Sequence, residues 1–200
     1  MTSSDPTSAR LQRDQRYRAE ETSLIDVVRA GEPIYPDLDG ILDLPQLAPP
    51  TIPASAGALI RDRRGRLLIL KPTYKGGWTI PGGVIEADGE SPWDACRREA
   101  MEETGLEVTT GRLVCVDFLR PRPERPGGLR FLFDCGVLDD AVLATVVLQP
   151  EEISEHRLVA LPEALPLLSG PVRRRVRAAR KSGRVRYLED GRPVPGVRHR

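Results

Sequence analysis

Three glutamates within five residues of this chain could bind a metal ion. Glu99, Glu102 and Glu103 stand at spacings that place their side chains on one side of an α-helix as near neighbours. Like charges at these spacings destabilise an isolated helix, so the arrangement is better explained with a cation among the carboxylates. Carboxylate oxygens are hard ligands, and the expected ion is therefore Mg²⁺, with Mn²⁺ as a substitute. Because Mg²⁺ completes its shell with phosphate oxygens, a diphosphate is the natural substrate.

The surrounding residues carry the signals that would form this helix. Ser91 is a good N-cap, Pro92 suits the first helical position, and Asp94 stands three residues after the cap. Gly105 supplies a residue that can adopt the left-handed conformation at the C-terminal end. The sequence therefore predicts a helix over 92–104. The face expected to pack on a sheet carries Trp93, Cys96, Ala100 and Thr104.

A simpler interpretation is a solvated helical face whose glutamates pair with Arg97 and Arg98. A lone pattern of three glutamates would favour that interpretation. Here a Gly82-Gly83 loop, the cap, the arginine and the terminal glycine follow one another in order, and together they favour the metal site.

This order of residues resembles the signature of the Nudix hydrolases, which cleave nucleoside diphosphates linked to another group. The signature is commonly written as Gly, five residues, Glu, seven residues, Arg-Glu, an aliphatic residue, any residue, Glu-Glu, any residue, Gly and an aliphatic residue. From Glu90 to Leu106 the spacing of this chain agrees with it. Between Gly83 and Glu90 there are six residues instead of five. We place the extra residue in the turn 87–89, which leaves the role of Glu90 open.

The resemblance implies a Mg²⁺-dependent hydrolase that acts on a phosphoanhydride bond of a nucleoside diphosphate derivative, such as a nucleotide sugar, a dinucleotide or a nucleoside triphosphate. The implied metal ligands, three of them also catalytic, are Gly82 through its carbonyl, Glu99, Glu102 and Glu103. Orienting or structural roles fall to Gly83, Arg98 and Gly105. Which carboxylate acts as general base stays open.

Four residues outside the signature are further candidates. Many Nudix enzymes use an additional glutamate, and Glu152 and Glu155 are candidates for it, with surface acids as the equal alternative. Arg120 and Arg130 flank a Pro- and Gly-rich loop at 121–128 and would suit phosphate or base recognition. A solvated hairpin tip explains these arginines equally well.

The fold class expected from the pattern and the resemblance is α/β, a Nudix-type α/β/α sandwich with a mixed central sheet. Apolar or alternating stretches predict strands at 56–61, 66–71, 112–119, 129–137 and 157–161. The apolar run 141–148 fits a buried strand or a short helix, and residues 162–168 predict the start of a second helix.

Composition indicates one sizeable core, since 200 residues with 40% hydrophobic side chains rarely build two. We predict an N-terminal extension and linker over 1–50, with a short helix at 24–28. A Nudix domain follows over 51–170. A basic helix and tail over 171–200 would pack on that domain.

The C-terminal segment 171–200 holds eleven Lys or Arg and two acidic residues, a net charge of +9. The whole chain carries +1, so the first 170 residues carry −8. An amphipathic helix with Val172, Val176 and Ala179 toward the core explains the segment, its arginines meeting solvent or the acidic body. Nucleic acid is an unlikely partner, because no aromatic residues alternate with the charges.

The remaining expectations concern location and partners. Cys96, Cys115 and Cys135 are widely spaced and predict reduced, buried thiols in a helix and two strands, and with them a cytoplasmic protein. No apolar run approaches the ~20 residues of a membrane span, and the first residues do not form a secretory leader. Many relatives pair, so a homodimer is possible.

Two other classes of function stay open beside the hydrolase. One is a catalytically inactive Nudix-fold module that binds nucleotides or regulates a partner. The other is a Nudix-fold isomerase of isoprenoid diphosphates, which would call for a catalytic Cys and additional His ligands that the sequence does not reveal.

Overall fold

The computed structural model describes residues 52–87, 89–123, 126–180 and 183–198. The chain divides into two units, Met1–Pro50 and Thr51–Arg200. All the described residues belong to the second unit. The short helix predicted at 24–28 lies outside them, with the rest of the predicted extension.

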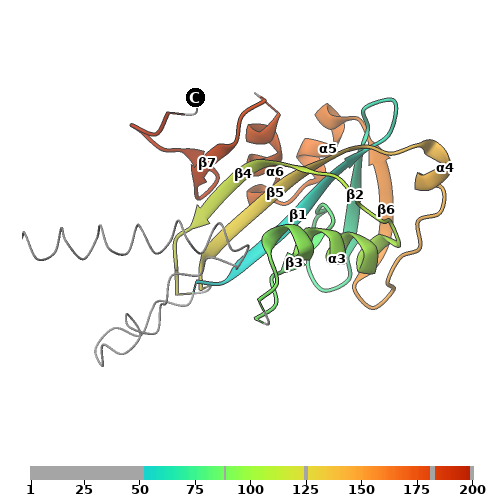
Figure 1. Ribbon diagram of the computed structural model, residues 1–200, viewed down its shortest axis with the longest axis horizontal. Coiled ribbons are helices and arrows are strands. Elements are labelled where there is room, and N and C mark those ends of the chain that lie inside the picture. Colours follow the sequence, from blue (N-terminus) through green and yellow to red (C-terminus); the bar gives the residue numbers. More distant parts are fainter. Residues whose placement is uncertain (1–51, 88, 124–125, 181–182, 199–200) are drawn as a thin grey trace, which may run out of the picture. The chain divides into compact units, whose positions relative to one another are not determined.

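A mixed sheet forms the centre of the second unit (Figure 1). Its strands are β1 (Ala54–Arg61), β2 (Leu67–Pro72), β3 (Gly82–Val84), β4 (Arg112–Leu119), β5 (Gly128–Val137), β6 (Ile153–Val159), β7 (Arg186–Glu189) and β8 (Arg192–Pro193). Along the sheet the order is β6-β2-β1-β5-β4-β7-β8, and β3 pairs with β1. The pairs β1–β5 and β4–β7 are parallel and the others are antiparallel. The predicted mixed sheet is confirmed.

Helices cover both faces of the sheet, as the α/β/α prediction requires. Figure 1 shows α3 (Pro92–Thr104) on one side of β1, and α5 (Leu161–Leu167) and α6 (Gly170–Ala179) on the other. The side chains of β1 alternate accordingly: Ala58 and Ile60 pack with α3, whereas Leu59 packs with α5 and α6. Two apolar cores therefore hold the layers together.

Helix α3 begins and ends where its local signals predict. The Ser91 hydroxyl accepts a hydrogen bond from the Asp94 N–H (3.1 Å) and donates one to the Asp94 carboxylate (2.6 Å). Gly105 has φ 68°, and its N–H donates to the Met101 carbonyl (2.7 Å). The helix is fixed at both ends by the residues that immediately flank it.

Other predicted elements are confirmed with small shifts. Strands β1, β2, β4 and β5 and helix α5 lie within two residues of the predicted ranges. Helix α6 turns Val176 and Ala179 into the core, with Val172 partly buried beside them. All three cysteines are buried and free. Within the described residues no helix is long and apolar enough to cross a membrane.

Of the two alternatives for the apolar run 141–148, the short helix is confirmed in part by α4 (Asp140–Leu143), and Val147 is 71% exposed. Two other predictions in the second half of the chain need correction. Strand β6 begins at Ile153 instead of 157, because its pairing with β2 extends beyond the apolar residues. The predicted tail contains β7 and β8, and β7 pairs with β4 to extend the sheet.

Candidate functional site

Two glycines of β3 allow close contacts on either side of this strand, with β1 at Gly82 and with α3 at Gly83. A Cβ at Gly82, where φ is 145°, would lie 2.3 Å from the carbonyl oxygen of Ala56 in β1. A Cβ at Gly83 would lie 2.3 Å from Oε1 of Glu99. The Glu99 carboxylate therefore rests directly against the glycine backbone, in space that any other residue would fill.

The guanidinium of Arg98 connects Val84 and Glu90, which follow the glycines of β3, to the glutamates of α3. Its Nη1 donates to Glu99 (2.9 Å) and to Glu102 (2.8 Å). Its Nε and Nη2 donate to the two oxygens of Glu90 (2.8 and 3.1 Å), and Nη2 also donates to the Val84 carbonyl (3.0 Å). These five hydrogen bonds match the five donors of a guanidinium.

Glu90, whose role the sequence left open, lies in this network. Its Oε2 also accepts the Glu86 N–H (2.9 Å), so it closes the turn before α3. Hydrogen bonds from Arg98 first, and from the Glu86 N–H second, hold the pKa of Glu90 below its usual value. The arrangement assigns Glu90 a loop-ordering contact with Arg98.

Glu103 is the most buried carboxylate of the cluster, at 3% exposure. Its Oε2 accepts the Gly82 N–H at 2.8 Å. Burial, aided by the charges of Glu99 and Glu152, raises the pKa of Glu103 to about 7, although Gly82 and Lys75 oppose the shift. The carboxylates of this site therefore repel one another.

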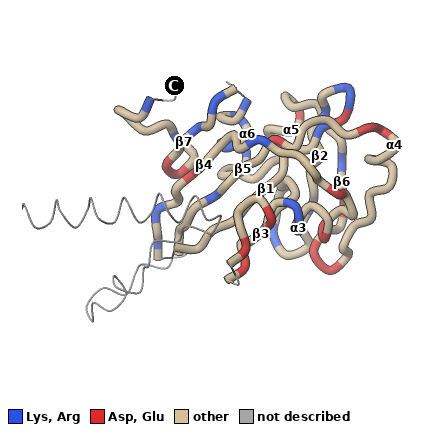
Figure 2. Tube along the Cα trace, viewed as in Figure 1, with Lys and Arg blue, Asp and Glu red and all other residues tan. Residues whose placement is uncertain are grey.

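The pKa of Glu99 is raised for related reasons. Burial is the largest cause, Arg98 opposes it, and the charges of Glu102 and Glu152 add to it. Glu152 thus acts electrostatically on both Glu99 and Glu103, although it comes from the loop before β6. Figure 2 shows acidic and basic positions next to each other along α3.

The other candidates from the sequence lie apart from this cluster. Glu155 pairs with Arg157 on β6 (2.7 Å). Arg120 forms ion pairs with Glu189 and Asp190 near β7.

Arg130, in contrast, reaches a cavity of about 270 Å³ beside the glycines of β3. Its guanidinium donates to the main-chain carbonyls of Pro53, Gly127 and Leu129. The cavity wall includes Gly82, Gly83, Tyr74, Lys75, Arg130, Val172 and Arg175. Three cationic side chains therefore line a space next to the carboxylates.

Sequence reasoning missed two of these cations. Lys75 carries no signal in the sequence beyond its place between two strands. Arg175 looked like one of several arginines on a helix, yet its side chain is only 14% exposed and pairs with the fully buried Asp117 (3.4 Å). Its place next to Val176, three residues after Val172, is the helical signal that could have marked it as half-buried.

A metal ion has suitable donors here. Across the described residues, no three His, Cys, Asp or Glu side chains already form a group that could hold a metal ion, and Arg98 binds Glu99 and Glu102. The donors are nonetheless all hard oxygens, and Glu99 and Glu103 repel each other in a buried place. A hard divalent cation fits this donor set, because it would relieve that repulsion.

Comparison with known proteins decides the family. The model of the NUDIX domain matches residues 51–179, well over half of the chain. The chain belongs to the Nudix family. Its Nudix domain and its similarity to MutT proteins indicate a pyrophosphohydrolase.

Three relatives of this Nudix protein illustrate the match. A MutT-like protein of Streptomyces ambofaciens is 34% identical over 115 residues, which cover 54% of this chain and 71% of the relative. An isopentenyl-diphosphate Delta-isomerase of Clavibacter michiganensis is 30% identical over 113 residues, and the chain spans only 58% of its length. The solved MutT protein of Methanosarcina mazei superimposes with a TM-score of 0.54 at 28% identity, covering 68% of this chain and all of that one.

Proposed function

We propose that this Nudix protein is a Mg²⁺-dependent hydrolase that cleaves a phosphoanhydride bond in a nucleoside diphosphate linked to another moiety. One observation carries the proposal. Two repelling carboxylates, the half-buried Glu99 and the buried Glu103, adjoin a cavity lined by three cationic side chains. A cation among the acids and a polyanion in the cavity would satisfy both charge sets at once.

The residues that would hold Mg²⁺, or Mn²⁺ in its place, are Glu99, Glu102 and Glu103 with the carbonyl of Gly82. When bound, such an ion stabilises negative charge on the phosphate oxygens and acidifies an attacking water. Arg98 orients the glutamates through its contacts with Glu99 and Glu102. Gly83 leaves the space in which the Glu99 carboxylate lies, and Gly105 ends the helix.

The chain's other residues would bind the substrate and move a proton. Lys75, Arg130 and Arg175 would attract the phosphate groups into the cavity. Glu152 is the better-placed base candidate, because its charge acts on Glu99 and Glu103. Glu155 is engaged by Arg157, and Arg120 by residues near β7, so we give neither a catalytic role.

The test is turnover with a panel of nucleotide sugars, dinucleotides and nucleoside triphosphates, with and without Mg²⁺. We expect release of a nucleoside monophosphate, and we expect Glu102→Gln to lower kcat at least ~100-fold, a loss of about 2.7 kcal/mol of transition-state stabilisation. Glu107→Gln, an exposed glutamate just after α3, is the matched control. Unchanged turnover in Glu102→Gln, or activity insensitive to a chelator, would contradict the metal mechanism.

The inactive nucleotide-binding module is distinguished by the same panel. Such a module would bind nucleotides in calorimetry and release no product with either ion. For the isomerase, the residues lining the cavity beside β3 include neither Cys nor His, and those groups are what we expect an isomerase to need.

Location and assembly stay predictions. The three buried free thiols support a cytoplasmic protein. A homodimer would be seen directly by sedimentation of the full chain.

A further inference from the structure

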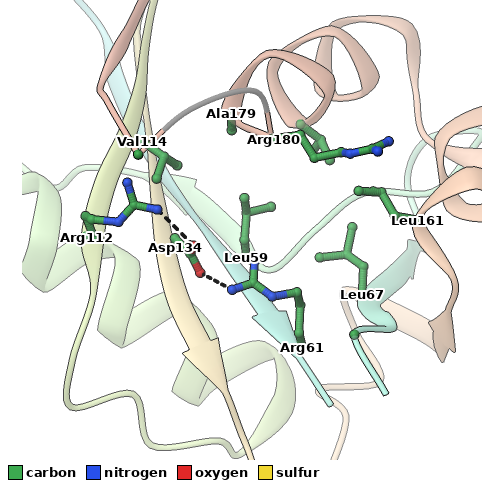
Figure 3. A pocket seen from close by; sticks show the side chains of 12 residues that line it. Leu59, Arg61, Leu67, Arg112, Val114, Asp134, Leu161, Ala179 and Arg180 are labelled. Atoms are coloured by element: carbon green, nitrogen blue, oxygen red, sulfur yellow. Dashed lines mark hydrogen bonds and ion pairs between the residues drawn. The ribbon is translucent and has the colours of Figure 1, made fainter. Parts of the chain in front are cut away.

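A second cavity, of about 370 Å³, lies on the face of the sheet that α5 and α6 cover (Figure 3). It adjoins Arg61, at the far end of β1 from the glycine contact at Ala56. These two positions are roughly 17 Å apart along an extended strand. None of its lining residues also lines the cavity beside β3.

One part of the cavity wall is apolar. It includes five buried aliphatic side chains from β1, β2, β4 and α6, which are Leu59, Leu67, Val114, Val176 and Ala179. The volume lies in the range of pockets that receive small molecules, and its lining would bury the apolar body of such a molecule.

Arginines surround the apolar part. Arg61, Arg112 and Arg180 line the cavity together with one carboxylate, Asp134, so its wall carries two positive charges in excess. Arg61 donates to Oδ1 of Asp134 (2.7 Å) and Arg112 to Oδ2 (3.4 Å), as Figure 3 shows.

The negative charge of Asp134 is therefore already balanced by two arginines, and its Oδ1 also accepts the Gly136 N–H (3.0 Å). Each guanidinium has five donors, and these contacts use one from Arg61 and one from Arg112. Donors and positive charge remain available to a ligand that enters beside the aliphatic wall.

We propose that this cavity is a second ligand site, which binds a small organic anion with an apolar body, such as an aromatic carboxylate or phosphate. The anionic group would bind the guanidinium of Arg112, and Arg180, whose guanidinium points away from Arg112 in Figure 3, would add positive charge on the opposite side of the cavity. The apolar body would cover Leu59, Val114 and Ala179. The site is separate from the proposed active site, because the two cavities share no lining residue.

A pair of fluorescent probes tests the proposal on the full chain. Anilinonaphthalene sulfonate and N-phenyl-naphthylamine share their ring system, and only the first carries an anionic group. We expect saturable binding of the sulfonate at one site. Arg112→Ala should weaken it roughly tenfold and Arg180→Ala by a smaller factor, and both should leave binding of the neutral probe unchanged. Arg192→Ala, an exposed arginine on β8 outside the cavity, is the matched control.

Further arms locate the probe and define the anion. Ala179→Leu should fill the cavity and reduce the affinity for both probes, with the thermal unfolding transition retained. Displacement by benzoate or by phenyl phosphate, against sodium chloride at equal ionic strength, distinguishes a carboxylate ligand from a phosphate ligand. The proposal is overturned if the arginine variants bind the sulfonate like the parent protein. It is equally overturned if Arg130→Ala abolishes probe binding, which would place the probe beside β3.

Discussion

The guanidinium of Arg98 places a positive charge among three carboxylates. Its contacts with Glu90, Glu99 and Glu102 use the planar geometry of the guanidinium, including a bidentate pair with Glu90. A lysine could supply the charge but only three donors from a single point. The geometry of this residue, beyond its charge, is what holds the turn and the glutamates in register.

Arg98→Lys should therefore impair catalysis although the charge is kept. We expect kcat to fall about tenfold or more, because Glu99 and Glu102 lose their fixed positions. Steady-state kinetics measure the effect, and Arg97→Lys on the same helix is the control. Equal kcat for Arg98→Lys and the parent protein would contradict the orienting role.

The buried carboxyl of Glu103 should make stability depend on pH in the metal-free protein. Its pKa rises from 4.5 to about 7 on folding, so the folded state binds more protons between these values. Its contribution to the free energy of unfolding is fully present below about pH 4.5 and is lost as the pH rises to about 7. The loss is about 3 kcal/mol by linkage.

Denaturant unfolding in a chelator between pH 4.5 and 8 measures this contribution. Glu103→Gln should flatten the profile in this window, whereas Glu107→Gln should leave it unchanged. A parent protein whose unfolding free energy rises steadily from pH 4.5 to 7 would contradict the expected sign.

At the scale of elements, two adjacent glycines of β3 have different roles. Gly82 is needed for folding, and Gly83 is needed for the position of Glu99. A Cβ at Gly82 would meet backbone, the Ala56 carbonyl, whereas a Cβ at Gly83 would meet the end of a flexible side chain, Glu99. Backbone cannot yield easily, but a carboxylate can rotate away.

Gly82→Ala should therefore lower the free energy of unfolding by about 2 kcal/mol or more. Gly83→Ala should fold with nearly the parent stability and lose most of its activity, because Glu99 is displaced. Thermal unfolding and kcat measured on both variants form an internal control. Identical effects of the two substitutions on both quantities would contradict this division.

The elements that the sequence predicted well are those with local causes. Helix α3 matches because Ser91 and Gly105 fix its ends through contacts within a few residues. The start of β6 and the strand β7 were missed because β2 and β4 define them from far along the chain. The arginine-rich sequence around β7 also made this strand difficult to predict.

The candidate site divides in the same way. The glutamates on α3 and the glycines follow from spacing, and the structure brings them together. The roles of Lys75 and Arg175 depend on which side chains meet across the sheet, and Asp117 gives no local sign that it will be buried with an arginine. Contacts between distant elements are therefore what the sequence could not supply.

At the scale of the whole molecule, the basic C-terminal segment is part of the domain. Asp117, at the centre of β4, accepts hydrogen bonds from Arg175 of α6 (3.4 Å) and from the Gly191 N–H between β7 and β8 (2.8 Å). Burial lowers the pKa of Arg175, and the charge of Asp117 opposes that effect. The buried carboxylate of Asp117 therefore connects the basic C-terminal segment, through Arg175, to the wall of the cavity beside β3.

Asp117→Asn should destabilise the protein and weaken substrate binding together. We expect a loss of about 3 kcal/mol in unfolding free energy, because the buried Arg175 loses its counter-charge, and a raised KM as the arginine shifts. Asp139→Asn, at an exposed pair with Arg63, is the control for denaturant unfolding and kinetics. Parent-like stability of Asp117→Asn would contradict the bracing role.

Helix α6 lines both cavities, with Val172 and Arg175 facing one and Val176, Ala179 and Arg180 facing the other. The residues Arg175 and Arg180 are separated by only about 8 Å of helix rise. An occupant of one cavity that shifted this ten-residue helix would also shift residues that line the other cavity. Thermodynamic coupling between two sites is reciprocal. If an organic anion changes the affinity for substrate by some factor, substrate changes the affinity for that anion by the same factor.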